Sequence, residues 1–284
     1  MTDIARSGDA DIHYEAIGDA AGPVVVLVAG AGAPAEFWID PFCASLASAG
    51  FRVVRYWNRD TGLSVRSQQR YPIDVLVADL LAVMAEIHAA SYHLVGHSMG
   101  GYIVNLAATR YPEYVKSLTS ISSGPGTSAV VKKKLQLSEQ LTSMWFELSK
   151  NRPRGNFEDD LSGWLKVWKY LNGSVEFNEG MARDYTRALY VGPDAKYTSV
   201  GNHFHALTTV PDTLIGALGH SKLPFLGIHG SKDLLVPPDH GEAAARLVRE
   251  SRFELLEGAG HMFFNDGIWD DVSRLVLEHL KAEA

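Results

Sequence analysis

The sequence predicts an α/β fold in which a mostly parallel, doubly wound sheet carries a helical insertion. Short runs rich in β-branched residues, such as Pro23–Ala29, are typical of strands that helices cover on both faces. These runs alternate with amphipathic helical patterns such as Ile73–Ala89, which indicates parallel strands joined by helical crossovers. Between Gly124 and Val210 aromatic-rich helical patterns replace the short runs, and these indicate the insertion.

The strands are predicted from two kinds of sequence pattern. Asp11–Ile17 alternates polar and apolar residues, which is the period of a half-buried strand near a sheet edge. The other strands are predicted from apolar runs, several of which end in residues that favour turns. In chain order they are Pro23–Ala29, Phe51–Tyr56, Tyr92–Val95, Val115–Ile121, Leu223–Gly230 and Arg252–Leu256. Helices are expected over Phe37–Leu46, Ile73–Ala89, Asp239–Val248 and Ile268–Lys281, and another is expected to end at Tyr111.

The chain is expected to divide into a core and a cap. Residues 1–124 and 211–284 form the predicted core domain, and residues 125–210 form a predicted helical cap over the strand ends. In the cap, two sets of apolar residues recur at helical spacing, and most of their aromatic rings are expected to hold the cap together. The sets are Leu137, Leu141, Met144, Trp145 and Leu148, and Leu161, Trp164, Leu165, Trp168 and Leu171.

Composition excludes several classes of protein. The 284 residues are 46% hydrophobic and 21% charged, with a formal charge of −7, and the one basic run, Lys132–Lys134, is too short for a nucleic-acid face. Neither a signal-peptide core nor an apolar run of about eighteen residues is found, so a soluble, cytoplasmic protein without a membrane partner is expected. Cys43 is the only cysteine, which excludes an internal disulfide, and we expect it to pack in the core.

A nucleophile elbow is predicted at Gly96-His97-Ser98-Met99-Gly100. A strand precedes this Gly-x-Ser-x-Gly pentapeptide and a helix follows it. Serine at so sharp a turn adopts a strained backbone, and the two glycines are needed because side chains would collide there. The turn lifts the Ser98 hydroxyl clear of the sheet and directs helical N–H groups at the same place.

Ser98 needs a base and an acid, and chain order supplies both. Asp233 and His261 each follow a predicted strand, at the edge where open α/β sheets assemble their sites. Gly258-Ala259-Gly260 is expected to let the imidazole swing over the serine. Asp239 and Asp212 are rival acids, but Asp239 is better explained as the residue that starts a helix.

An oxyanion hole is expected from the backbone N–H groups of Met99 and Ala31. The small residues Gly30–Ala33 suit a close approach, although they also fit a plain tight turn. His203-Phe204-His205 could suggest a metal pair, but no further ligand lies nearby at suitable spacing, so packing in the cap is expected instead. Neither a metal nor an organic cofactor is required.

The motifs Gly-His-Ser-Met-Gly, Gly-Ser-Lys-Asp and Gly-Ala-Gly-His give the chain a resemblance to α/β-hydrolases over essentially its whole length. The segment Arg59–Ser64 also resembles the Arg-Asp-Thr-Gly-x-Ser turn of aclacinomycin methylesterase-like tailoring esterases. Many members carry His-Gly at the end of the oxyanion strand, whereas this chain has Ala29-Gly30. The resemblance therefore implies an oxyanion loop that is supported in another way.

The predicted activity is serine-dependent hydrolysis of a carboxylic ester of a small apolar or aromatic molecule. Substrate contacts are expected at Gly32, Trp145, Trp168, Leu235 and Met262. Carbon–carbon bond hydrolysis and perhydrolysis would use the same three side chains, and a cofactor-free cyclase or lyase, or a slow-turnover ligand receptor, stays open as another class. Dehalogenases and epoxide hydrolases of this fold use a carboxylate nucleophile, which Ser98 argues against. The oligomeric state is left open.

Overall fold

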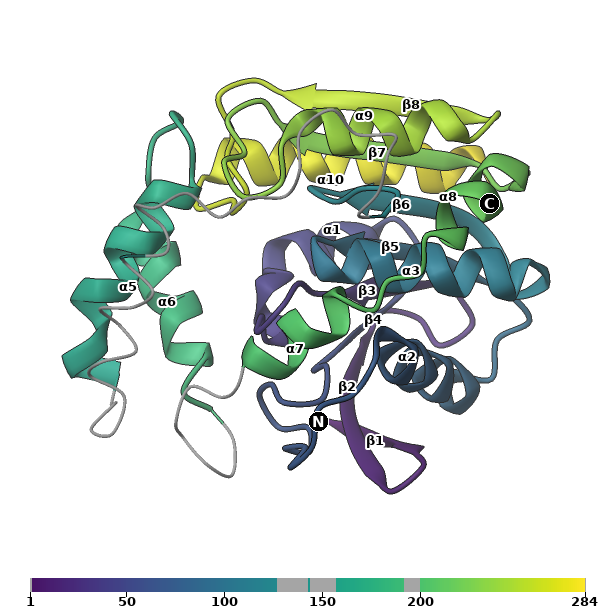
Figure 1. Ribbon diagram of the computed structural model, residues 1–284, viewed down its shortest axis with the longest axis horizontal. Helices are drawn as coiled ribbons and strands as arrows, with labels where there is room; N and C mark the ends of the chain where they lie inside the picture. The colour runs from purple at the N-terminus through teal and green to yellow at the C-terminus, as the bar shows by residue number, and fades with distance from the viewer. Residues whose placement is uncertain (1, 127–142, 144–156, 192–199, 284) are drawn as a thin grey trace.

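Eight strands form one sheet in the order β1-β2-β4-β3-β5-β6-β7-β8 in the computed structural model, which describes residues 2–126, 143, 157–191 and 200–283 (Figure 1). The pairs β1–β2 and β2–β4 are antiparallel, and every pair from β4 to β8 is parallel. The predicted fold class is therefore confirmed. The strands are β1 Asp3–Ser7, β2 Ala10–Ile17, β3 Val24–Val28, β4 Arg52–Tyr56, β5 Tyr92–His97, β6 Val115–Ile121, β7 Phe225–Gly230 and β8 Ser251–Leu256.

Burial along the strands follows their place in the sheet. All five residues of the central strand β3 are buried, whereas β2 alternates over its first half between buried and half-buried positions. The edge strand β1 was not predicted, because its five residues Asp3–Ser7 alternate too briefly and carry two charged side chains. It pairs with β2 through a tight turn in which Gly8 has a φ of 62°.

Helices cover both faces of the sheet (Figure 1). Helices α2, α3, α8 and α9 pack on one face, and α1 and α10 pack on the other. In the part of the chain that the structure describes, no helix is long and apolar enough to cross a bilayer. The helices are α1 Asp40–Ser48, α2 Ile73–Ile87, α3 Met99–Arg110, α8 Thr213–His220, α9 Pro238–Leu247 and α10 Asp266–Ala282.

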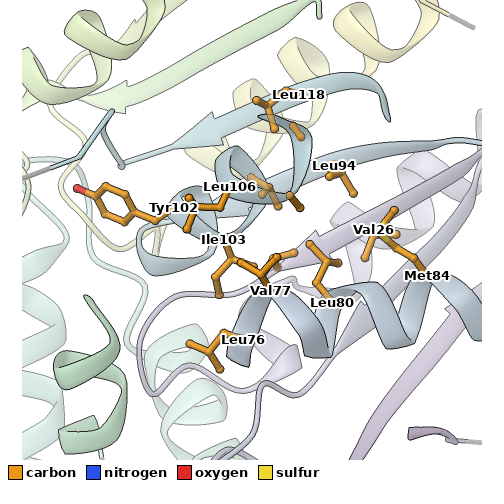
Figure 2. Packing of buried hydrophobic residues seen from close by; sticks show 14 of the residues in the cluster. Val26, Leu76, Val77, Leu80, Met84, Leu94, Tyr102, Ile103, Leu106 and Leu118 are labelled. Carbon is orange, nitrogen blue, oxygen red and sulfur yellow. The ribbon is translucent and has the colours of Figure 1, made fainter. Parts of the chain in front are cut away.

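The apolar core on the α2–α3 face includes side chains of the central strands β3 and β5 (Figure 2). Val26 of β3 and Leu94 of β5 are fully buried, as are Leu80 of α2 and Ile103 of α3. Val26 pairs with Leu94 in the register of the two parallel strands. This packing holds β5 and α3, and hence the turn between them, in one position.

Three further helices are described in the predicted insertion: α5 Phe157–Leu171, α6 Glu179–Ala188 and α7 Val200–Leu207. Helices α5 and α6 stand beside the strand ends, and their apolar side chains join the cluster on the α1–α10 face (Figure 1). Helix α7 instead packs against α2, and its Ala206 belongs to the opposite cluster. The helix predicted over Leu137–Leu148 lies outside the described residues.

Leu80→Ala is expected to lower the free energy of unfolding by about 2–5 kcal/mol, because it removes a fully buried side chain and leaves a cavity. Urea denaturation followed by far-UV circular dichroism measures this. Leu255→Ala is the matched control, since Leu255 is 49% exposed and its replacement should change stability by less than about 0.5 kcal/mol. Equal losses in the two variants would contradict the assignment of this core.

Candidate active site

Ser98 lies at a strained turn between β5 and α3. Its φ of 54° and ψ of −118° are unusual for a residue with a side chain. A Cβ on Gly96 would overlap the Gly100 carbonyl, and a Cβ on Gly100 would overlap the carbonyl of Val28 in β3. The two glycines therefore let the chain turn tightly against β3, which is the geometry of a nucleophile elbow.

A continuous hydrogen-bonded line joins Ser98, His261 and Asp233. His261 Nε2 lies 3.0 Å from Ser98 Oγ, and His261 Nδ1 lies 2.8 Å from Asp233 Oδ2. With Nδ1 protonated and donating to the carboxylate, Nε2 is free to accept the serine proton. The structure thus brings together the three side chains that the sequence singles out, from loops after β5, β7 and β8.

The carboxylate of Asp233 is surrounded by donors. Its Oδ1 accepts the backbone N–H groups of Leu235 at 2.9 Å and Val236 at 2.8 Å, and His229 Nε2 lies 3.3 Å from its Oδ2. Burial alone would raise the pKa of Asp233, but the interactions with His261 and His229 outweigh it and hold the pKa well below its ordinary value. Asp233 is therefore ionised at neutral pH.

His97, the second residue of the pentapeptide, supports the loop that carries His261. Its Nε2 donates to the His261 carbonyl over 2.9 Å, and the Phe37 ring stacks on it with centroids 4.2 Å apart. Burial, helped by the neighbouring His261, lowers the pKa of His97 to about 3, so this ring stays neutral. The sequence pattern alone did not assign a role to it.

The loop that carries His261 is fastened to the end of α5. Gly260 N–H donates to Asn172 O and Met262 N–H to Leu171 O, both over 3.0 Å. A Cβ on Gly260 would overlap the backbone of residues 171–173. The glycine-rich segment was expected to let the imidazole swing, but the structure gives Gly260 another purpose: it allows two backbones to approach closely.

The loop after β3, where the oxyanion donor is expected, lies against Ser98. A Cβ on Gly30 would come within 3.1 Å of Ser98 Cβ. The loop closes a turn through Ala33 N–H and Gly30 O at 3.2 Å, with Gly32 at a φ of 68°. Ala31 is the residue after Gly30, so its N–H lies close to the turn at Ser98. Met99 is the first residue of α3, and the first N–H groups of a helix have no partner within it.

Side chains from distant parts of the sequence bind the backbone of this loop at two residues, Ala29 and Gly32. The Gly32 N–H donates to His203 Nδ1 over 2.8 Å, and the Ala29 carbonyl accepts from Asn58 Nδ2 over 3.1 Å. The sequence assigned His203 to packing in the cap, and this was wrong, because α7 docks its ring against two loops of the core. The local pattern around His203 holds no signal for this long-range contact.

Of the other residues expected to contact substrate, one is buried among aromatic rings, one lines a cavity and one binds Asp233 through its backbone. The Trp168 indole is 6% exposed, stacks on Trp164 and donates to Thr186 Oγ1 over 2.8 Å. Met262 lines a cavity of about 360 Å³ with Tyr185 and several other side chains. Leu235 contributes its backbone to the Asp233 carboxylate, as described above. Trp145 lies outside the described residues.

Comparison with known proteins identifies the family of this chain. The family model described as the alpha/beta hydrolase fold matches residues 23–268. The chain belongs to the α/β-hydrolase fold family. The predictions of the family and of a hydrolase are thus confirmed, and a hydrolase of this family acts on a small-molecule substrate.

Two curated relatives of this α/β-hydrolase are rhodomycin D methylesterases. DnrP of Streptomyces peucetius is 27% identical over 282 residues, and DauP of Streptomyces sp. strain C5 is 30% identical over 277, each alignment covering 92% of both chains. Among solved structures, an esterase from Exiguobacterium antarcticum is 19% identical with a TM-score of 0.80, covering 99% of this chain and 100% of that one. At that identity, the structure supports the fold alone.

His97 should make stability depend on pH. Between pH 6.5 and its lowered pKa of about 3, the unfolded chain binds a proton at this position and the folded protein does not, so stability falls as the pH falls. From pH 6.5 to pH 4 this one group should remove about 3 kcal/mol of unfolding free energy. Urea denaturation across this range should give a steeper loss for the wild type than for His97→Gln, which keeps a donor. Parallel curves would contradict the prediction.

Proposed function

We propose that this α/β-hydrolase cleaves a carboxylic ester through Ser98, His261 and Asp233. The observation that carries the proposal is the connected line from Ser98 Oγ to His261 Nε2 and from His261 Nδ1 to the ionised Asp233. A serine hydroxyl is a weak nucleophile at neutral pH until a positioned base removes its proton. The strained elbow supports the same role, because it presents the hydroxyl at the strand ends.

In the first half of the reaction, Ser98 Oγ attacks the ester carbonyl while His261 Nε2 takes the hydroxyl proton. Asp233 stabilises the resulting imidazolium and holds its tautomer. The N–H groups of Met99 and Ala31 bind the oxyanion, at a place where the helix α3 dipole adds positive potential. His261 then passes its proton to the leaving alcohol as the carbon–oxygen bond breaks.

The second half of the reaction releases the acid. A water molecule gives a proton to His261 and attacks the acyl-enzyme, and the tetrahedral intermediate is held by the same two N–H groups. Collapse of this intermediate returns the proton to Ser98 Oγ and frees the carboxylic acid. Each step uses side chains and backbone groups of the chain itself.

The substrate class is inferred from the relatives and from the aromatic residues of the helical insertion. The relatives named as rhodomycin D methylesterases support a methyl ester as the bond that is cleaved. In the proposed cap, the described helices α5 and α6 stand beside the strand ends and carry Trp164, Trp168 and Tyr185. An apolar or aromatic acid esterified with a small alcohol fits this environment.

Ser98→Ala should lower the rate of the chemical step by about 10⁶-fold, because a triad acts as a unit. The measurement is the hydrolysis of p-nitrophenyl acetate and of methyl esters of aromatic acids by the purified protein. The wild type should also be labelled at Ser98 by an organophosphonate, which mass spectrometry detects. Undiminished turnover of a natural substrate by the variant would favour a cyclase or lyase, and tight ligand binding with negligible turnover would favour a receptor.

Asp233→Asn should lower kcat by about 10⁴-fold at neutral pH. The amide oxygen can keep the two backbone bonds from Leu235 and Val236, and the amide nitrogen then faces His261. This arrangement favours the tautomer with Nε2 protonated, which cannot accept the serine proton. Asp239→Asn is the matched control and should leave kcat within about two-fold, so a comparable loss in the control would identify the wrong carboxylate.

A further inference from the structure

The oxyanion loop is anchored at both ends to one turn of the chain. Asn58 donates to the carbonyl of Ala29 at the start of the loop. At the far side, His203 accepts the Gly32 N–H at Nδ1 and donates from Nε2 to the carbonyl of Arg59 over 2.8 Å. The ring of His203 is therefore a bridge between the oxyanion loop and the turn at residues 58–61.

The turn at residues 58–61 is itself held by an ion pair and by hydrogen bonds. The Arg59 guanidinium forms a bidentate ion pair with Asp79 of α2, and both side chains are buried. Asp60 has a φ of 68° and accepts from Tyr71 Oη over 2.7 Å and from Asn202 Nδ2 over 3.0 Å. Because Asn202 precedes His203, these contacts fix the first turn of α7 against the same residues.

The bridge requires a neutral imidazole. His203 is fully buried, and burial lowers its pKa despite nearby acidic groups, so protonation is disfavoured at neutral pH. With the proton on Nε2 for the Arg59 carbonyl, Nδ1 keeps the lone pair that accepts the Gly32 N–H. Protonation of Nδ1 would turn that acceptor into a donor and release Gly32.

Holding Gly32 also fixes Ala31. Gly32 follows Ala31 in the turn that Ala33 N–H and Gly30 O close, and it has a positive φ, so a displacement of Gly32 changes the backbone angles that Ala31 can adopt. An oxyanion donor must lie within about 3 Å of the developing charge, and a shift of about 1 Å can cost 10²-fold in rate. The direction of the Ala31 N–H therefore depends on the partner of Gly32.

We propose that His203 is a positioning residue for oxyanion stabilisation, holding the Gly32 N–H so that the Ala31 N–H stays aimed beside that of Met99. This inference rests on the proposed ester hydrolysis. It assigns the support of the loop to a histidine from α7, in a chain that carries Ala29 before Gly30. His203 acts through Gly32 and does not contact the reacting atoms in this role.

Two substitutions separate the halves of the bridge. His203→Asn places an amide oxygen near the position of Nδ1 and keeps an acceptor for Gly32, whereas His203→Gln places an amide near Nε2 and keeps a donor for Arg59. His203→Phe keeps a ring and removes both bonds. Hydrolysis of p-nitrophenyl acetate gives kcat and KM for each variant, and thermal unfolding measures the general loss of stability.

His203→Gln and His203→Phe should lose about 10- to 100-fold in kcat with KM changed by less than about three-fold, and His203→Asn should keep kcat within about three-fold. The affinity for an aryl trifluoromethyl ketone, which adds Ser98 Oγ and forms an oxyanion, should fall with kcat. The affinity for the matching methyl ketone should not change, and a merely structural role would not give this difference.

The outcomes distinguish the two proposals. If the wild type neither hydrolyses esters nor binds the trifluoromethyl ketone, ester hydrolysis fails and the positioning role falls with it. If the wild type is active and the Asn and Gln variants behave alike, the positioning role alone is overturned, and this comparison holds even where His203→Phe does not fold.

Discussion

The close approach of the turn at Ser98 to strand β3 is the constraint on which the site depends. Gly100 lies against the Val28 carbonyl, and Gly30 lies against Ser98, so Ser98 and the loop after β3 share one small volume. Side chains at these two glycines would push the loop and the elbow apart. The buried packing of β3, β5, α2 and α3 stabilises an arrangement that the strained backbone at Ser98 would otherwise oppose.

Around this turn, buried histidines have different charge states and different tasks. His261 lies between a serine and an ionised carboxylate, so it can become charged during a reaction. His97 and His203 have lowered pKa values because they are buried, and each binds backbone groups of a loop. The ring that we propose to exchange protons, His261, thus lies near neutral rings that bind the backbone of its surroundings.

The sequence predicted the parts of the site that follow from local pattern and chain order. Ser98 lies in a recognisable pentapeptide, and Asp233 and His261 follow strands whose ends must meet at one edge. His203 could not be placed in this way, because its partner Gly32 is 171 residues away and depends on how α7 docks. Strand β1 was missed for a different reason: its pairing with β2, and not its own five residues, makes it a strand.

Hydrogen bonds join the end of α5 and the loop around His261 into one unit. Backbone bonds run from Gly260 to Asn172 and from Met262 to Leu171, and Phe264 N–H donates to Asn172 Oδ1 over 2.9 Å. A chimera that exchanges the cap with that of a relative would cut through this unit if its junction fell between the two segments. Grafts that carry residues 171–173 and 258–264 together would preserve the backbone bonds around His261 while the rest of the proposed cap is replaced.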